Sequence, residues 1–138
     1  MHRLPDWEAR LAAYLEPLRL RAFAWGEHDC CLFTAGAVLA MTGVDPMPEF
    51  RGRYTTPIGA GRALRRYGAG TLDATLDTKF APIAPALAQR GDIVMTDGLL
   101  GIAWGPFLFG VGSEGEREGL VRVDRASWVD PLAWRVPY

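Results

Sequence analysis

The last third of the sequence contains five short runs rich in β-branched and aromatic residues, separated by Gly, Pro and Asp. The runs are DIVMT (92–96), LLGIAW (99–104), PFLFGV (106–111), GLVRV (119–123) and AWRV (133–136). This punctuation is typical of antiparallel strands joined by short turns. We therefore expect a β-meander of about five strands over residues 91–136.

The residues before this region have helical spacing and helix-end signals. Apolar side chains recur at intervals of three and four, and Gly or Pro interrupts them at regular points. The predicted helices run from Trp7 towards Pro17 after the cap Asp6, from Asp29 to the stop at Gly43, from the Thr56–Pro57 start to Gly68, and from Thr71 to Lys79. The helical part thus covers about residues 6–80.

Helices first and strands afterwards predict an α+β fold. A chain of 138 residues is long enough for one packed core, so we expect a single domain over residues 1–138. Two segments are predicted as surface loops. APIAPA (81–86) contains two prolines, and GSEGEREG (112–119) is the solvated loop of a hairpin.

Charge and hydropathy exclude several classes of protein. The formal net charge is -1, with both signs scattered along the chain, so no basic surface for nucleic acid is expected. The sequence has no apolar run that spans a bilayer and no secretory core after Met1, which predicts synthesis in a cytoplasm.

The stretch WGEHDCCLF, residues 25–33, carries the densest set of reactive side chains. Zinc sites use spaced pairs of ligands, whereas here the ligands are contiguous and no Cys or His follows. The Gly- and Arg-rich segment 59–70 lacks the G-K-[ST] ending of a phosphate loop. We therefore expect neither a metal nor a cofactor, and we expect Cys30 and Cys31 to be reduced thiols.

Cys30 has one feature of a nucleophile. It follows the predicted cap Asp29, and the positive end of a helix dipole favours loss of a thiol proton. A cysteine hydrolase also needs an imidazole base. The sequence holds two histidines, His2 near the terminus and His28 two residues before Cys30. His28 is thus either a surface or capping residue or a substitute base.

The sequence resembles the NlpC-type branch of papain-like cysteine peptidases, which cut peptide bonds in bacterial cell walls. It is also similar to short phage and prophage proteins of unknown function encoded among tail genes. The shared patterns are W-G-x-x-D-C, carried by Trp25, Gly26, Asp29 and Cys30 with Phe33 behind them, and G-D-[IV]-V followed by G-I, carried by residues 91–94 and 101–102. The phage group adds TGVDP (42–46) and RGRY (51–54).

The resemblance implies an NlpC-like fold with Cys30 at the position of the nucleophile. In these peptidases the base is the His of H-V-G-I, and the matching position here is Leu99. The third polar residue matches Val111 or Gly112, and neither can orient an imidazole. Cys30 thus stands at the nucleophile position without the base and the orienting residue of the peptidases. It is therefore either a nucleophile with an unusual base or, together with Cys31, a small buried packing residue.

Two functions remain open. The first is a structural or docking component of a phage tail tip, or a tail assembly factor, that binds other tail proteins of the tip or hub and is associated with the virion. The second is an active cysteine peptidase or amidase on peptidoglycan, with Cys30 as nucleophile and a base such as His28. The predicted contact segments of a docking protein are residues 44–57, 80–90 and 133–138.

Overall fold

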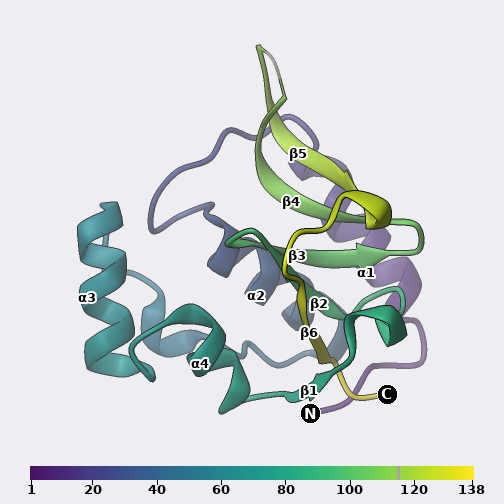
Figure 1. The fold of residues 1–138 in the computed structure, drawn as a ribbon, viewed down its shortest axis with the longest axis horizontal. Helices are drawn as coiled ribbons and strands as arrows, with labels where there is room; N and C mark the ends of the chain where they lie inside the picture. Colours follow the sequence, from purple (N-terminus) through teal and green to yellow (C-terminus); the bar gives the residue numbers. More distant parts are fainter. Residues whose placement is uncertain (115) are drawn as a thin grey trace.

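Helices occupy the first part of the chain and strands the last part, as Figure 1 shows for the computed structural model, which describes residues 1–114 and 116–138. The α-helices are α1 (Trp7–Leu15), α2 (Cys30–Thr42), α3 (Pro57–Tyr67) and α4 (Leu72–Asp77). The strands are β1 (Ala81–Ile83), β2 (Ile93–Thr96), β3 (Leu99–Trp104), β4 (Phe107–Glu114), β5 (Arg117–Asp124) and β6 (Leu132–Arg135). Short 3-10 turns are η1 (Glu16–Leu18), η2 (Pro48–Phe50), η3 (Pro85–Leu87) and η4 (Arg125–Ser127). The expected α+β single domain is confirmed.

The strands form one antiparallel sheet in the order β1-β6-β2-β3-β4-β5. Strands β2 to β5 follow one another as hairpins, as a meander does. Strand β6 departs from that order, because it returns across the sheet and pairs with both β1 and β2. The β2–β3 turn and helix α3 lie on the same side of the molecule (Figure 1).

The two predicted loops are both partly strand. Residues 81–83 pair with β6, with Pro82 opposite Trp134, so the expectation of a loop at 81–86 is wrong there. Proline fits because β1 is an edge strand, where a missing N–H costs no ladder bond. In the segment 112–119, pairing extends to Glu114 and Arg117, and its Gly115 lies outside the described residues.

The predicted ends of α2 and α3 are confirmed, whereas α4 starts after Thr71, as predicted, but ends at Asp77, before the expected Lys79. The Asp29 carboxylate accepts a hydrogen bond from the Leu32 backbone N–H at 2.9 Å, and Gly43 ends α2 with a φ of 78°. The Thr56 hydroxyl caps α3 in the same way. Asp6 makes no cap hydrogen bond, because its carboxylate instead accepts from the Arg10 guanidinium.

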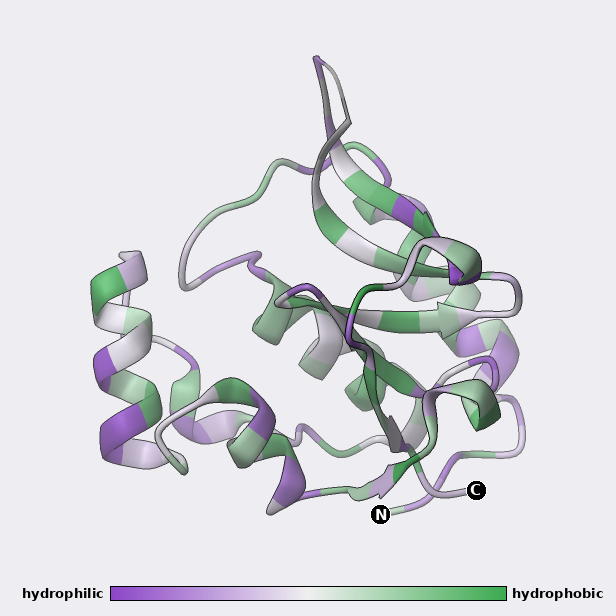
Figure 2. Cartoon of the chain, in the orientation of Figure 1, coloured by the Kyte–Doolittle hydropathy of each residue, from purple (hydrophilic) through white to green (hydrophobic). Residues whose placement is uncertain are grey.

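The two faces of the sheet belong to different apolar clusters. Leu100 and Ile102 point into the main core with α1 and α2, whereas Val94 and Ala103 belong to a smaller cluster on the other face. In Figure 2 helix α2 is coloured green to near-white without purple, whereas green and purple residues alternate along α3. Accordingly, α2 is the central buried helix and α3 borders the core with one side only. None of the helices in the described part of the chain is long and apolar enough to span a bilayer.

Candidate functional site

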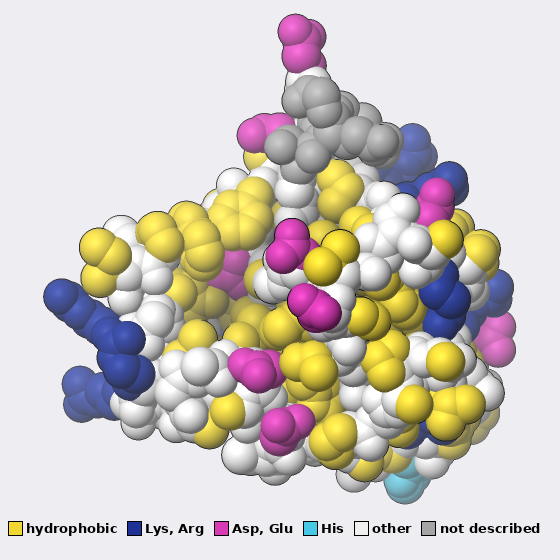
Figure 3. Space-filling model, viewed as in Figure 1, with side chains coloured by type: hydrophobic (Ala, Val, Ile, Leu, Met, Phe, Trp, Pro, Cys, Tyr) yellow, Lys and Arg dark blue, Asp and Glu magenta, His cyan; other side chains and the backbone are white. Residues whose placement is uncertain are grey.

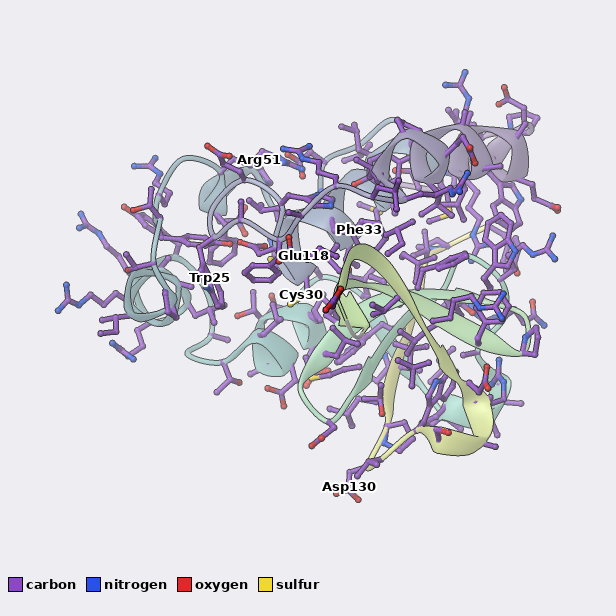
Figure 4. All side chains as sticks on the ribbon, turned by 90° about the horizontal axis from the view of Figure 1, so that it is seen from above. Trp25, Cys30, Phe33, Arg51, Glu118 and Asp130 are labelled. Carbon is purple, nitrogen blue, oxygen red and sulfur yellow. The ribbon has the colours of Figure 1, made fainter. Side chains whose placement is uncertain are left out.

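An apolar pocket opens at the start of α2, between α3 and the β2–β3 turn, with a volume of about 320 Å³. We call it the Cys30 pocket. Its lining residues are Trp25, Asp29, Cys30, Cys31, Phe50, Tyr54, Pro57, Ala60, Gly61, Leu64, Leu72 and Gly98. Figure 4 shows Cys30 where the helices meet the sheet, with Trp25 on the side that faces α3. The pocket is large enough for one or two side chains of a partner or substrate.

Buried Asp29 holds the start of α2 in place. Its carboxylate accepts hydrogen bonds from the Gly26 N–H at 3.0 Å, the Leu32 N–H at 2.9 Å and the Tyr54 hydroxyl at 2.5 Å. Burial and the hydrogen bond to Asp29 raise the pKa of Tyr54, so its hydroxyl stays a donor. W-G-x-x-D and RGRY are thus two parts of one hydrogen-bonded unit.

Gly26 is needed in this unit for two reasons. Its φ of +78° is left-handed, and a Cβ at this position would lie 1.9 Å from the Tyr54 carbonyl oxygen. The segment before α2 can therefore pack against residues 54–55 only with glycine here. This close approach brings together Trp25 and Tyr54, which both line the pocket.

Cys30 lines the pocket, and the surroundings of its thiol favour the protonated form. Burial raises the pKa of Cys30. A hydrogen bond with the Leu100 backbone lowers this pKa, but only enough to offset part of the effect of burial. Burial raises the pKa of Cys31 as well. The expectation that the helix start lowers the pKa of Cys30 is wrong, because burial of the thiol outweighs the backbone hydrogen bonds at this position.

His28 lies away from the Cys30 pocket. The residue is 2% exposed, so the surface interpretation is wrong, and its Nε2 has no hydrogen-bond partner among the described residues. It borders a separate cavity with Tyr14 and Arg21, together with Leu32 and other residues on the face of α2 turned away from Cys30. Burial and the nearby Arg21 charge lower the pKa of His28.

Leu99 also points away from Cys30. Strand residues alternate between the two faces of a sheet. Leu100 faces the main core near Cys30, so Leu99 packs against the opposite cluster. A Cβ at Gly110 would lie 3.1 Å from the Leu99 methyl groups, which places that side chain over β4. The position that matches the peptidase His thus differs in side-chain direction as well as in residue type.

The G-D pattern at residues 91–92 serves the fold. Asp92 is fully buried and accepts hydrogen bonds from Arg3 at 2.9 Å, Arg135 at 3.0 Å and two backbone N–H groups, of Gln89 and Val136. Figure 1 shows the two chain ends side by side near this point. Asp92 therefore ties the N-terminal segment to the last strand.

The tryptophans are divided between different parts of the molecule. Trp134 is in the main core at 1% exposure and Trp128 packs on the other face of the sheet. Trp104 borders a groove beside α1, and Trp25 lines the Cys30 pocket. Strand β6 lies between β1 and β2, and Ala133, Trp134 and Val136 are buried, so within the predicted contact segment 133–138 only Pro137 and Tyr138 are exposed.

Sequence reasoning missed the α3 wall and Tyr54 as parts of the site. Pro57, Ala60, Gly61 and Leu64 follow the three-and-four spacing of one helix face, a signal that was present in the sequence. The partnership of Tyr54 with Asp29 had no local signal. No group of three or more His, Cys, Asp or Glu within residues 1–114 and 116–138 could hold a metal ion.

Comparison with known proteins gives one family. The model of the family described as a domain of unknown function (DUF6950) matches residues 2–136. A search of curated proteins gives no match. Because the family match covers nearly the whole chain, and includes both the Cys30 pocket and the Asp92 cluster, the chain belongs to the DUF6950 family.

Proposed function

We propose that this domain is a non-catalytic docking protein whose binding surface is the face around the Cys30 pocket. The resemblance to short tail-gene proteins suggests the setting, a bacteriophage tail tip or its assembly, with other tail proteins as neighbours. Peptidase ancestry explains why the nucleophile position is retained. In this proposal the pocket binds an apolar side chain of a partner, and no bond is cleaved.

The observation that carries the proposal is the environment of the Cys30 thiol. Burial raises its pKa, His28 borders a different cavity, and Leu99 points to the other face of the sheet. Thiol hydrolases depend on an imidazole within hydrogen-bond reach of the sulfur. Loss of one member of such a unit typically lowers the rate by several orders of magnitude.

A second candidate is an active cysteine peptidase or amidase on peptidoglycan. It is favoured by one observation, namely that Cys30 begins α2 and faces an open pocket. That geometry allows a substrate to reach the sulfur. The two functions differ in whether peptide bonds are cleaved.

Release of soluble peptides from purified peptidoglycan separates the two functions. Wild-type protein and Cys30→Ala should both leave the substrate intact over a long incubation, as followed by chromatography and mass spectrometry. Cys30→Ala is a mild control because it removes only the sulfur from a pocket wall. Release by the wild type that is lost in Cys30→Ala would overturn the proposal and establish the second candidate.

The phage setting has its own test. Particles purified from a lysogen that carries the gene should contain peptides of this chain when digested and examined by mass spectrometry. An assembly factor that leaves before completion should instead be found on unfinished tails. If the chain is found on neither particles nor tail intermediates, the tail setting is wrong.

A further inference from the structure

One side of the Cys30 pocket carries a local excess of positive charge. Helix α3 forms this side of the pocket, and its sequence contains Arg62, Arg65 and Arg66 but neither Asp nor Glu. A helix turns by about 100° per residue, which places Arg65 beside Gly61 at the edge of the face that lines the pocket. The Arg65 guanidinium lies 3.7 Å from the Cβ position at Gly61, so a cation borders the pocket mouth.

The opposite side of the same pocket carries negative charge. Gly98 lines the pocket, and exposed Asp97 precedes it in the β2–β3 turn. The Asp97 backbone N–H donates to the Val129 carbonyl at 3.1 Å, which brings the exposed Asp130 beside the turn. Residues 91–113 contain no Lys or Arg, so this charge has no local compensation in the sequence.

The charges of α3 and of the β2–β3 turn form no ion pair among the described residues. In the part of the chain that the structure describes, no ion pair involves Arg62, Arg65 or Arg66 of α3, and none involves Asp97 or Asp130. The overall charge is close to zero, so the two sides form a dipole across one face. Such unpaired charges favour a partner of the opposite pattern.

Apolar side chains are exposed next to both charged sides. Ile58 on α3 is 69% exposed and Val129 beside Asp130 is 51% exposed, while Trp25 at the pocket is 39% exposed. Figure 3 shows hydrophobic side chains between the arginines at the left edge and the acidic groups nearer the centre. An apolar centre with a polar rim is the usual anatomy of a protein interface.

We propose that this face pairs with a second copy of the chain about a two-fold axis through the pocket mouth. The inference rests on the proposed docking function and names its partner. In a two-fold interface the same patch occurs on both subunits and must complement itself. Opposite charges on opposite sides of an apolar centre meet this condition, because the rotation places Arg65 of each copy against Asp97 and Asp130 of the other.

The test is a pair of charge reversals. In sedimentation equilibrium, the mass of the wild type should reach twice 15.1 kDa as the protein concentration is raised to about 1 mM. The dimer should weaken as the salt concentration is raised. R65E and D97K/D130K should each weaken the dimer by about tenfold or more. An equimolar mixture of the two variants should restore it, since every contact in the mixed dimer again joins opposite charges.

Folding controls keep the result interpretable. Asp97 and Asp130 have φ of 45° and 44°, so lysine there adds strain, whereas Asn tolerates this conformation. D97N/D130N should therefore fold like the wild type and weaken the dimer less than the lysine pair does. A wild type that stays monomeric, or a dimer unaffected by all of these variants, overturns the inference. Cys30-dependent hydrolysis of peptidoglycan would instead overturn the proposed function.

Discussion

The Tyr54 hydroxyl donates a hydrogen bond of 2.5 Å to the Asp29 carboxylate, which joins the η2–α3 connection to the start of α2 across 25 positions of sequence. This bond places Tyr54 against the thiols, so one wall of the Cys30 pocket depends on it. The two residues come from separate sequence patterns, and neither pattern alone predicts the contact.

Tyr54→Phe should reduce the free energy of unfolding by about 1.5–3 kcal/mol, because a buried carboxylate loses one of its donors. Urea denaturation followed by tryptophan fluorescence measures the loss. Tyr67→Phe is the matched control, since Tyr67 is a half-buried tyrosine at the end of α3 and its substitution should change stability by less than about 0.5 kcal/mol. Equal losses in both variants would contradict the role of the Asp29 bond.

Gly26→Ala and Gly43→Ala should differ strongly although both glycines have a φ of 78°. At Gly43 a Cβ meets no atom within 4 Å, so the cost is the left-handed backbone alone, about 1 kcal/mol. At Gly26 the Cβ would collide with the Tyr54 carbonyl, which should raise the loss to about 3 kcal/mol or more. The difference between the urea midpoints of the two variants measures the cost of the contact between residue 26 and the Tyr54 carbonyl. Similar midpoints would show that residues 54–55 can move away from the added methyl group.

The elements that could be predicted from sequence are those set by nearby residues. Gly43 and the Thr56–Pro57 pair mark helix ends through bonds that reach only three or four residues, so they were readable locally. The predicted cap at Asp6 is wrong because its carboxylate accepts a hydrogen bond from Arg10, one turn later, and not from the helix backbone. Strand β1 was not predicted because its partner β6 lies about fifty residues further along the chain, and because its proline indicated a loop.

The candidate site could be predicted only in part. The pattern placed Cys30 at a helix start, but its ionisation depends on burial by α3 and the sheet, which no local spacing reveals. The direction of the Leu99 side chain depends on which face of the sheet α2 covers, a tertiary property. Alignment to a motif therefore identified the position, and the fold determined what that position can reach.

His28 should make the protein less stable in mild acid. Its pKa is lowered in the folded state, so below about pH 6.5 the unfolded chain binds a proton that the native protein does not. The stability contributed by neutral His28 is present above this pH and is lost as the pH falls, by up to about 1.4 kcal/mol per pH unit.

Urea denaturation between about pH 5.5 and 7.5 measures this slope. His28→Gln should flatten it whatever its effect on absolute stability, because the titrating group is gone. His2→Gln removes the other histidine, which is exposed, and should keep the wild-type slope. A slope that survives in His28→Gln would assign the acid sensitivity to other groups.

Leu99→His should fail to restore a catalytic pair with Cys30. The new imidazole would lie over Gly110 on the sheet face opposite α2, where it is partly buried among apolar groups and should cost about 1–3 kcal/mol of stability. Leu99→Met, of similar volume, should cost less than about 1.5 kcal/mol.

The alkylation rate of Cys30 by iodoacetamide tests whether residue 99 can reach the thiol. In a Cys31→Ala background, this rate should be the same with Leu, Met or His at position 99, at every pH from about 6 to 9. A rate that rises by about tenfold in Leu99→His alone, with a new inflection near the ordinary imidazole pKa, would mean that the sheet presents residue 99 to the thiol.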